Sequence, residues 1–434
     1  MRMTDIITQK RDGGELSPEE IGFFLQGIVK GEVPDFQASA LLMAIYFNGL
    51  SDQEQYEWSN ELLKLAVPMD LSDIPGVKIS KHSTGGVGDK VSLIVGPLVA
   101  AAGISVPMII GRGLAHTGGT LDKMESIAGF KTSLTAVEFK AALRKVNIAM
   151  MAPVEGLLPA DKKLYALRNG SGSSECIPMI AGSILARKLA EGTDGLVLDV
   201  KVGSGALTKK MTDARRLAQI MVTVGKRMGR KVVALITEMD QPLGYAVGHA
   251  LEVMEAIETL RGNGPDDLVQ ISLEIASRMV CLAHPDRSLE SAKEEIFQLL
   301  NDGKGLQKFR ELIEAQGGNP KVIDSFELLP NASAEHVISS PRAGFVSRIS
   351  ADDIGRAVAL IGQKPGGPEG ALDAAVGIVL EHKVGDRLNA GDRLCTIYYN
   401  DDSNLEEATS TVEDAFRISA TAPDTRPLVY EVMQ

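Results

Sequence analysis

The sequence is poor in cysteine and in positive charge. Its three cysteines, Cys176, Cys281 and Cys395, are far apart and odd in number, so they match neither a disulfide framework nor a zinc site. We therefore expect a reducing, cytoplasmic environment. The formal net charge of −12 argues against nucleic acid as a partner, because polyanions bind to basic surfaces.

Signals for insertion into a membrane are also scarce. Residues 1–6 lack the apolar stretch of a signal peptide. The run from Val91 to Ile110 carries no charge and is long enough to cross a bilayer, but two glycines and two prolines interrupt it. A buried helix followed by a buried strand fits this run better, so we expect no membrane partner.

The composition that remains is typical of a large globular protein. Of the 434 residues, 44% are apolar and 24% are charged, and a chain of this length is expected to form two or three domains. Residues 1–70 predict an all-helical domain. Ser17 and Ser51 each precede a glutamate by three residues, as in a capping box, and residues 36–47 show helical spacing of apolar side chains.

After residue 76 the pattern changes to short, β-branched apolar runs separated by helical segments. Such runs predict parallel strands covered by helices on both faces, and we assign residues 76–155 and 195–335 to one α/β domain. Residues 340–434 contain short strands separated by Gly-Asp turns, which predict a β-rich C-terminal unit. The expected fold class is α/β: a small all-helical domain, a larger mixed α/β domain with a central sheet, and a β-rich C-terminal subregion.

A glycine-rich segment, Lys-His-Ser-Thr-Gly-Gly-Val-Gly-Asp at 81–89, follows the first predicted strand and precedes a helix near Ser92. Its three glycines let the backbone approach a ligand, and the start of a helix favours an anion. Lys81, Ser83 and Ser92 add a charge and two hydroxyls, so the segment predicts a phosphate site. The alternative is a turn that is glycine-rich for structural reasons. The segment does not have the Walker pattern.

A second glycine-rich loop, residues 111–125, follows the next predicted strand. Ligands of parallel sheets gather at the carboxyl ends of the strands, so both loops are expected to meet at one phosphate, with Thr120 as a hydroxyl donor. His116 in this loop is either catalytic or structural.

In these two loops the chain resembles the thymidine and pyrimidine-nucleoside phosphorylases. The resemblance also includes Ala-Asp-Lys-Lys-Leu-Tyr-Ala-Leu-Arg at 160–168, Asp-Val-Lys-Val-Gly-Ser-Gly-Ala at 199–206 and Gln-Pro-Leu-Gly at 241–244, in the same order. It extends over almost the whole chain. It implies that residues near 160–190 complete the helical domain, that substrates bind between the helical and α/β domains, and that the protein is a homodimer.

The resemblance also implies a role for individual residues. Phosphate would be held by Lys81, Ser83, Ser92 and Thr120. The base would be held by His82, Tyr165, Arg168, Ser183 and Arg187, of which His82, Arg168 and Arg187 would be catalytic.

The implied reaction is reversible phosphorolysis of a pyrimidine (deoxy)nucleoside to the free base and (deoxy)ribose 1-phosphate. Phosphate is a co-substrate, and no cofactor is implied. Arg168 can place two hydrogen bonds on a planar ring while negative charge builds on the departing base. His82 can donate to a carbonyl oxygen or protonate the base near neutral pH.

Three positions depart from the family pattern. Ile110 stands where the family usually has a serine in the phosphate wall, and Arg187 stands where it has a lysine at the base. Arg-Asn-Gly-Ser at 168–171 replaces Arg-Asp-Val-Thr. We expect the chemistry to persist and the substrate preference to differ.

A further position concerns ions. Some relatives bind potassium through carbonyls near Gly88, Leu243 and Ala246 and a glutamate matching Glu255. Here Lys90 follows the first loop, and we expect its ammonium group to pair with Glu255 instead, so that no metal binds.

Three other functions stay open at this point. The first is a phosphorylase of the same family with shifted base or modified-sugar specificity. The second is a phosphoribosyltransferase, since the anthranilate type shares the architecture, although it needs an acidic magnesium site. The third is a nucleoside-binding protein without activity. An assay of many nucleosides with and without phosphate separates these functions.

Overall fold

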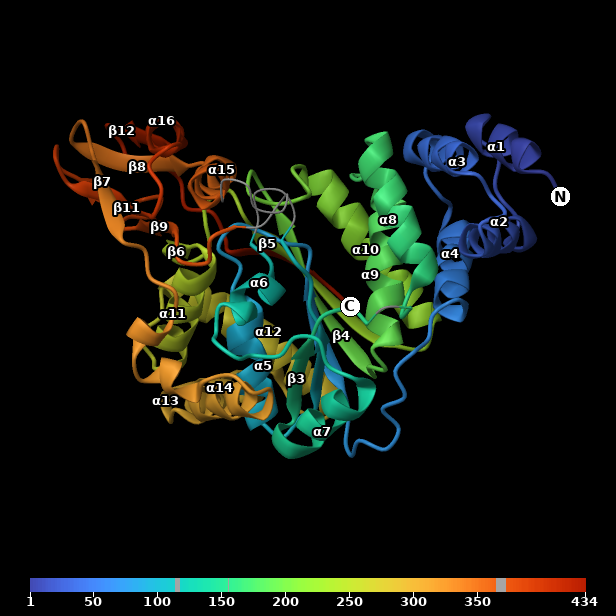
Figure 1. The fold of residues 1–434 in the computed structure, drawn as a ribbon, viewed down its shortest axis with the longest axis horizontal. Coiled ribbons are helices and arrows are strands. Elements are labelled where there is room, and N and C mark those ends of the chain that lie inside the picture. The colour runs from blue at the N-terminus through green and yellow to red at the C-terminus, as the bar shows by residue number, and fades with distance from the viewer. Residues whose placement is uncertain (114–117, 155, 364–371) are drawn as a thin grey trace.

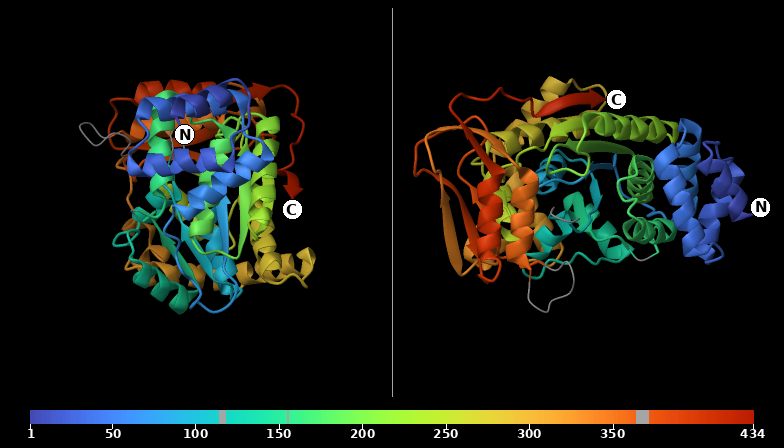
Figure 2. Two further views of the ribbon diagram at one scale, coloured as in Figure 1. Left: turned by 90° about the vertical axis from the view of Figure 1, so that its right-hand side faces the viewer. Right: turned by 90° about the horizontal axis from the view of Figure 1, so that it is seen from above.

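The computed structural model describes residues 1–113, 118–154, 156–363 and 372–434. Three parts lie in a row, with a helical bundle at one end, an α/β part in the centre and a β-rich part at the other end (Figure 1). The view from above shows the same order (Figure 2). The predicted fold class is therefore confirmed.

The helical bundle is built from two separate stretches of the chain, which lie side by side in Figure 1. Its helices are α1 (Met3–Arg11), α2 (Pro18–Lys30), α3 (Asp35–Asn48), α4 (Asp52–Lys64), α8 (Pro159–Ser171) and α9 (Ile177–Ala190). Both predicted capping boxes, at the starts of α2 and α4, are present.

Close packing inside the bundle fixes the position of α9. Trp58 of α4 is buried beside Phe24 of α2, with 5.6 Å between the ring centroids. It also lies against Gly182 of α9, where an added Cβ would be 3.0 Å from the indole ring. Because α9 approaches α4 this closely, its other face is turned toward the α/β part.

The central sheet contains three parallel strands, β1 (Ile79–Ser83), β4 (Gly195–Val202) and β5 (Lys231–Glu238). Two further parallel strands, β2 (Val106–Ile109) and β3 (Ile148–Met151), pair with each other and join the sheet through a bridge between Lys78 and Ser105. The carboxyl ends of β1 and β2 therefore lie at the same edge.

Helices cover both faces of the sheet, as predicted. One face packs on α9 and α10, and the other packs mainly on α5 and α12, with α14 packed on α5. The helices of this part are α5 (Val91–Ala101), α6 (Thr120–Glu125), α7 (Ala136–Val146), α10 (Met211–Arg227), α11 (His249–Leu260), α12 (Asp266–Ala283), α13 (Leu289–Asn301) and α14 (Lys304–Ala315), followed by two 3₁₀ turns, η1 (Pro320–Ile323) and η2 (Phe326–Leu328).

The C-terminal part is β-rich and has its own core. Its elements are β7 (Ala334–Ser339), β8 (Gly344–Ile349), α15 (Ala351–Gly362), β9 (Gly377–Leu380), β10 (Arg387–Leu388), β11 (Arg393–Tyr399), α16 (Leu405–Ala415) and β12 (Phe416–Ser419). The short strand β6 (Ala246–Val247) of the central part pairs with β9.

The last strand differs from the prediction, which placed residues 340–434 together. Strand β13 (Val429–Met433) leaves the C-terminal unit and pairs antiparallel with β5. It thereby covers an open edge of the central sheet, whose unpaired backbone groups need partners.

The apolar run from Val91 to Ile110 divides into the buried helix α5 and the buried strand β2, as predicted. Within the described parts of the chain, none of the helices combines the length and the apolar character that crossing a bilayer requires.

Candidate active site

A cavity of about 270 Å³ lies where the loops after β1 and β2 face α8 and α9. The structure brings all the predicted phosphate- and base-binding residues to this cavity. They are Lys81, His82, Ser83, Ser92, Thr120, Tyr165, Arg168, Ser183 and Arg187, and Ile110 lines it as well. Residues 114–117 of the second loop, and with them His116, lie outside the described residues.

Lys81 is buried on the α/β side of the cavity. Its Nζ is 3.3 Å from the Ser92 hydroxyl and lies 3.9 Å from Asp89 and 3.8 Å from Asp199. Burial lowers the pKa of Lys81, and the two carboxylates oppose this effect. The carboxylates also keep the ammonium group oriented at the cavity.

The glycines of the first loop are needed for packing as well as for access. Gly85 and Gly88 have positive φ angles, of 91° and 75°. A Cβ on Gly86 would be 2.7 Å from Met239, and one on Gly88 would be 2.6 Å from the carbonyl oxygen of Leu243. Gly85 and Gly86 line the cavity, and Gly86 and Gly88 also allow close contact with the 239–243 segment.

The second loop is stabilised by its own charged side chains. Asp122 accepts hydrogen bonds from the backbone amides of Gly113 and Gly119, and Arg112 pairs with both Asp122 and Glu125. These contacts hold Thr120, the first residue of α6, at the cavity wall. The two glycine-rich loops thus line one cavity, as predicted.

On the helical side, two predicted base-binding residues share one carboxylate. Ser183 donates a hydrogen bond of 2.9 Å to Oδ2 of Asp161, and Arg187 lies 3.3 Å from the same oxygen. Ser183 and Arg187 are four residues apart on α9, so they lie on one face of the helix. Asp161 on α8 therefore orients both groups.

Arg168 lies on the helical side of the cavity and keeps one nitrogen donor that no described residue satisfies. One terminal nitrogen donates to the carbonyl oxygen of Ser174 at 2.6 Å. Its Nε is buried and has no hydrogen-bond partner among the described residues. Leaving such a donor unsatisfied is costly, so the group is suited to an acceptor on a ligand. Tyr165 precedes it by about one helical turn and lines the same cavity.

His82 lies close to three positively charged side chains. Burial lowers its pKa well below 6.5, and the positive charges of Lys188, Arg187 and Lys81 lower it further. Of the two roles expected for His82, donation to a carbonyl oxygen does not require a protonated ring. A neutral imidazole still donates one hydrogen bond to a carbonyl oxygen.

A buried ion pair supports the floor of the site. Lys188 and Glu191, at the end of α9, are 2.6 Å apart. Glu191 also accepts from the backbone amide of Ile109 and the hydroxyl of Ser80, while Lys188 donates to the carbonyl oxygen of Ile109. These bonds fasten the end of α9 to β1 and β2 beside the cavity.

Sequence reasoning missed several of these supporting residues. Asp161, Asp89 and Asp199 lie inside the motifs that carried the family resemblance, but nothing local shows which side chains they hold. Lys188 and Glu191 are spaced three apart near the end of a helix, which was a usable signal for an ion pair.

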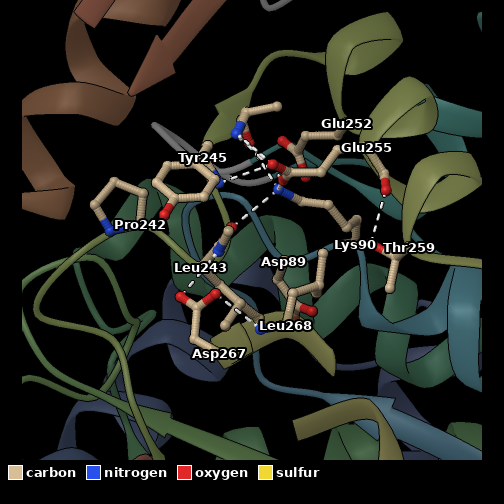
Figure 3. A network of polar contacts seen from close by, with 12 residues as sticks. Asp89, Lys90, Pro242, Leu243, Tyr245, Glu252, Glu255, Thr259, Asp267 and Leu268 are labelled. Atoms are coloured by element: carbon tan, nitrogen blue, oxygen red, sulfur yellow. Dashed lines mark hydrogen bonds and ion pairs between the residues drawn. The ribbon is translucent and has the colours of Figure 1, made fainter. Parts of the chain in front are cut away.

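The predicted partner of Lys90 is present (Figure 3). Its buried ammonium donates to the carbonyl oxygens of Leu243 at 2.9 Å and Ala246 at 2.7 Å and pairs with Glu255 at 2.5 Å. Among the residues that the structure describes, no group of three or more His, Cys, Asp and Glu side chains is placed to hold a metal ion.

Comparison with a solved structure first defines the class of fold. Anthranilate phosphoribosyltransferase from Thermus thermophilus matches with a TM-score of 0.58 and 17% sequence identity, over 71% of this chain and 98% of that chain. At this identity the likeness concerns the fold alone.

Family models and relatives then define the family. The helical bundle domain of the glycosyl transferase family matches residues 4–66, its α/β domain matches residues 76–306, and the pyrimidine nucleoside phosphorylase C-terminal domain matches residues 345–419. Pyrimidine-nucleoside phosphorylase of Geobacillus stearothermophilus is 45% identical over 99% of both chains, and that of Bacillus subtilis is 46% identical over 97% of both. The chain belongs to the pyrimidine-nucleoside phosphorylase family, as the resemblance predicted.

Proposed function

We propose that the protein catalyses the reversible phosphorolysis of pyrimidine nucleosides, as its relatives' name states for them. The observation that carries the proposal is that Lys81, Ser92 and Arg168, whose buried Nε has no hydrogen-bond partner among the described residues, line one cavity. An anion and a polar heterocycle can then bind together in one site.

The chemistry follows from the arrangement of charges. An oxygen of phosphate bonds to the anomeric carbon of the pentose as the bond between that carbon and the base nitrogen breaks, and the electron pair of the broken bond moves into the base. Arg168 and Arg187 stabilise the negative charge where it develops. His82 donates a hydrogen bond to a carbonyl oxygen of the ring or supplies the proton that the departing base takes up.

The experiment is an absorbance assay of uridine, thymidine and base- or sugar-modified nucleosides with and without phosphate. Release of free base only when phosphate is present, together with a pentose 1-phosphate product, supports the proposal. Binding without cleavage of any member of the panel contradicts it and favours a nucleoside-binding protein.

A second candidate is a phosphorylase of the same family with a shifted substrate. Ile110 favours it, because an apolar side chain at the wall of the cavity removes a hydroxyl donor and suits an apolar substituent. A modified nucleoside cleaved faster than uridine and thymidine in the same assay would identify this case.

The oligomeric state, the cellular location and the cofactor requirement are further parts of the proposal. We propose a homodimer in the cytoplasm that needs no cofactor or metal, with Lys90 filling the place of a cation. Phe36 and Phe47 on α3 are 73% and 76% exposed, which supports a contact between copies at the helical bundle. Light scattering after size-exclusion chromatography measures the oligomeric state, and assays in chelator and in potassium-free buffer measure the ion requirement.

A further inference from the structure

The 241–247 segment lies between the phosphate loop and the C-terminal unit. On the side of the phosphate loop, the Leu243 amide donates to the carbonyl oxygen of Val87 at 3.1 Å, and Lys90 binds the carbonyl oxygens of Leu243 and Ala246. Gly88 packs against Leu243 so closely that no Cβ fits between them. Because of this close contact, a shift of the 241–247 segment is expected to displace the phosphate loop.

On its other side the segment is held by Lys383, which belongs to the loop between β9 and β10. The Lys383 ammonium donates to the carbonyl oxygens of Pro242 and Gly244 and pairs with Asp267 of α12 at 2.9 Å. The Asp267 carboxylate in turn accepts from the amide of Gly244. Only 14% of the Lys383 side chain is exposed.

Backbone bonds reinforce this attachment. The Leu380 amide donates to the carbonyl oxygen of Tyr245 at 2.9 Å, and the Val384 amide donates to the side chain of Gln241 at 3.0 Å. Figure 3 shows Leu243 between Lys90 on one side and Asp267 of α12 on the other. Two lysines from opposite sides thus hold one turn through different carbonyl oxygens.

We propose that Lys383 is a positioning residue through which the C-terminal unit sets the affinity for phosphate. Without Lys383, the carbonyls of Pro242 and Gly244 lose their donor and Asp267 loses its counter-charge. The turn then relaxes, and the tight contact at Gly88 passes the shift to Ser83 and Asp89 at the cavity. The inference rests on the proposed function for the identity of the anion.

The base side is held by a different set of contacts. Ser183 and Arg187 depend on Asp161, and α9 is fastened to β1 and β2 by the Lys188–Glu191 pair. The bonds that hold this side do not involve the 241–247 segment. A change at Lys383 is therefore expected to alter the affinity for phosphate and not the affinity for the nucleoside.

The experiment compares Lys383→Met with Lys383→Arg and with Arg387→Met. Arg387 is an exposed cation on the neighbouring strand β10 and is the matched control. For Lys383→Met we expect the KM for phosphate to rise about tenfold while the KM for nucleoside changes less than about twofold. Lys383→Arg should recover part of the loss, and Arg387→Met should resemble the parent. Asp267→Asn, which keeps the amide contact but removes the charge, should raise the phosphate KM in the same direction.

A second measurement does not need activity. Phosphate should raise the melting temperature of the parent, and Lys383→Met should need about tenfold more phosphate for the same rise. Equal increases in both KM values, or an unchanged phosphate requirement in both measurements, would overturn the inference. If the parent shows no phosphorolysis, the proposed function fails, and the melting titration alone then decides the role of Lys383 in anion binding.

Discussion

Arg187 lies 3.3 Å from the same oxygen of Asp161 that accepts the hydroxyl of Ser183 at 2.9 Å. One carboxylate therefore orients two groups that face the base side of the cavity. Part of the charge of Arg187 is neutralised by Asp161, and its planar guanidinium keeps further donors for a ligand.

This relationship predicts that Arg187→Lys changes substrate preference. A lysine keeps the charge, but it has a single donor centre and cannot bind Asp161 and a ring together in the same plane. We expect the ratio of kcat/KM for thymidine to that for uridine to change by about fivefold or more. The Arg216→Lys variant on α10 serves as the control, and an unchanged ratio would show that Arg187 does not select the base.

Arg168→Ala tests the main cation of the base side. Removing it takes away a buried donor that has no partner among the described residues, so we expect kcat/KM to fall by about a hundredfold or more. The melting temperature shows whether the variant is folded. Activity equal to that of the parent would refute the role of Arg168.

Ile110→Ser tests the apolar wall. The new hydroxyl can donate to phosphate, and one such hydrogen bond contributes about 1 kcal/mol, so the KM for phosphate should fall by about fivefold. Ile110→Val keeps the wall apolar and should leave this KM near the parent value. A higher phosphate KM in Ile110→Ser than in Ile110→Val would contradict the prediction.

Lys90→Met tests the internal cation. The substitution leaves the Glu255 carboxylate and two backbone carbonyls without their shared donor, and breaking a buried pair costs about 3–5 kcal/mol. We expect a lower urea midpoint and a lower melting temperature. The double variant Lys90→Met with Glu255→Gln should recover part of the loss, whereas a loss below about 1 kcal/mol would show that the pair is not important for stability.

Glu238→Gln tests a buried carboxyl at the end of β5. Burial raises the pKa of Glu238 from 4.5 to about 7. Between these values the folded protein holds a proton that the unfolded chain has released, so this group's contribution to stability falls as the pH rises from 4.5 to 7. Because glutamine cannot ionise, the variant should not lose stability from this position as the pH rises.

The Glu238→Gln variant should therefore match the parent near pH 4.5 and exceed it by roughly 3 kcal/mol at about pH 8. Melting temperatures of both proteins across this range provide the measurement. Parallel curves would mean that Glu238 ionises as it does in the unfolded chain.

Much of the architecture could be predicted because its signals are local. The capping boxes at Ser17 and Ser51 depend on residues three positions apart, and both are present. Strands and helices followed from the spacing of apolar residues, and the two glycine-rich loops were placed by the strands that precede them. The order of several motifs was enough to identify the family, which the relatives confirm.

The sequence thus determined the fold class and most of the elements, and the family resemblance in its motifs supplied the set of site residues. Only the tertiary structure decided that Asp161 serves both Ser183 and Arg187, that burial lowers the pKa of His82, and that Lys383 reaches the turn behind the phosphate loop. The physical reason is distance along the chain. A side chain's partners, burial and pKa depend on segments that are remote in sequence, and they are fixed only when the domains pack together.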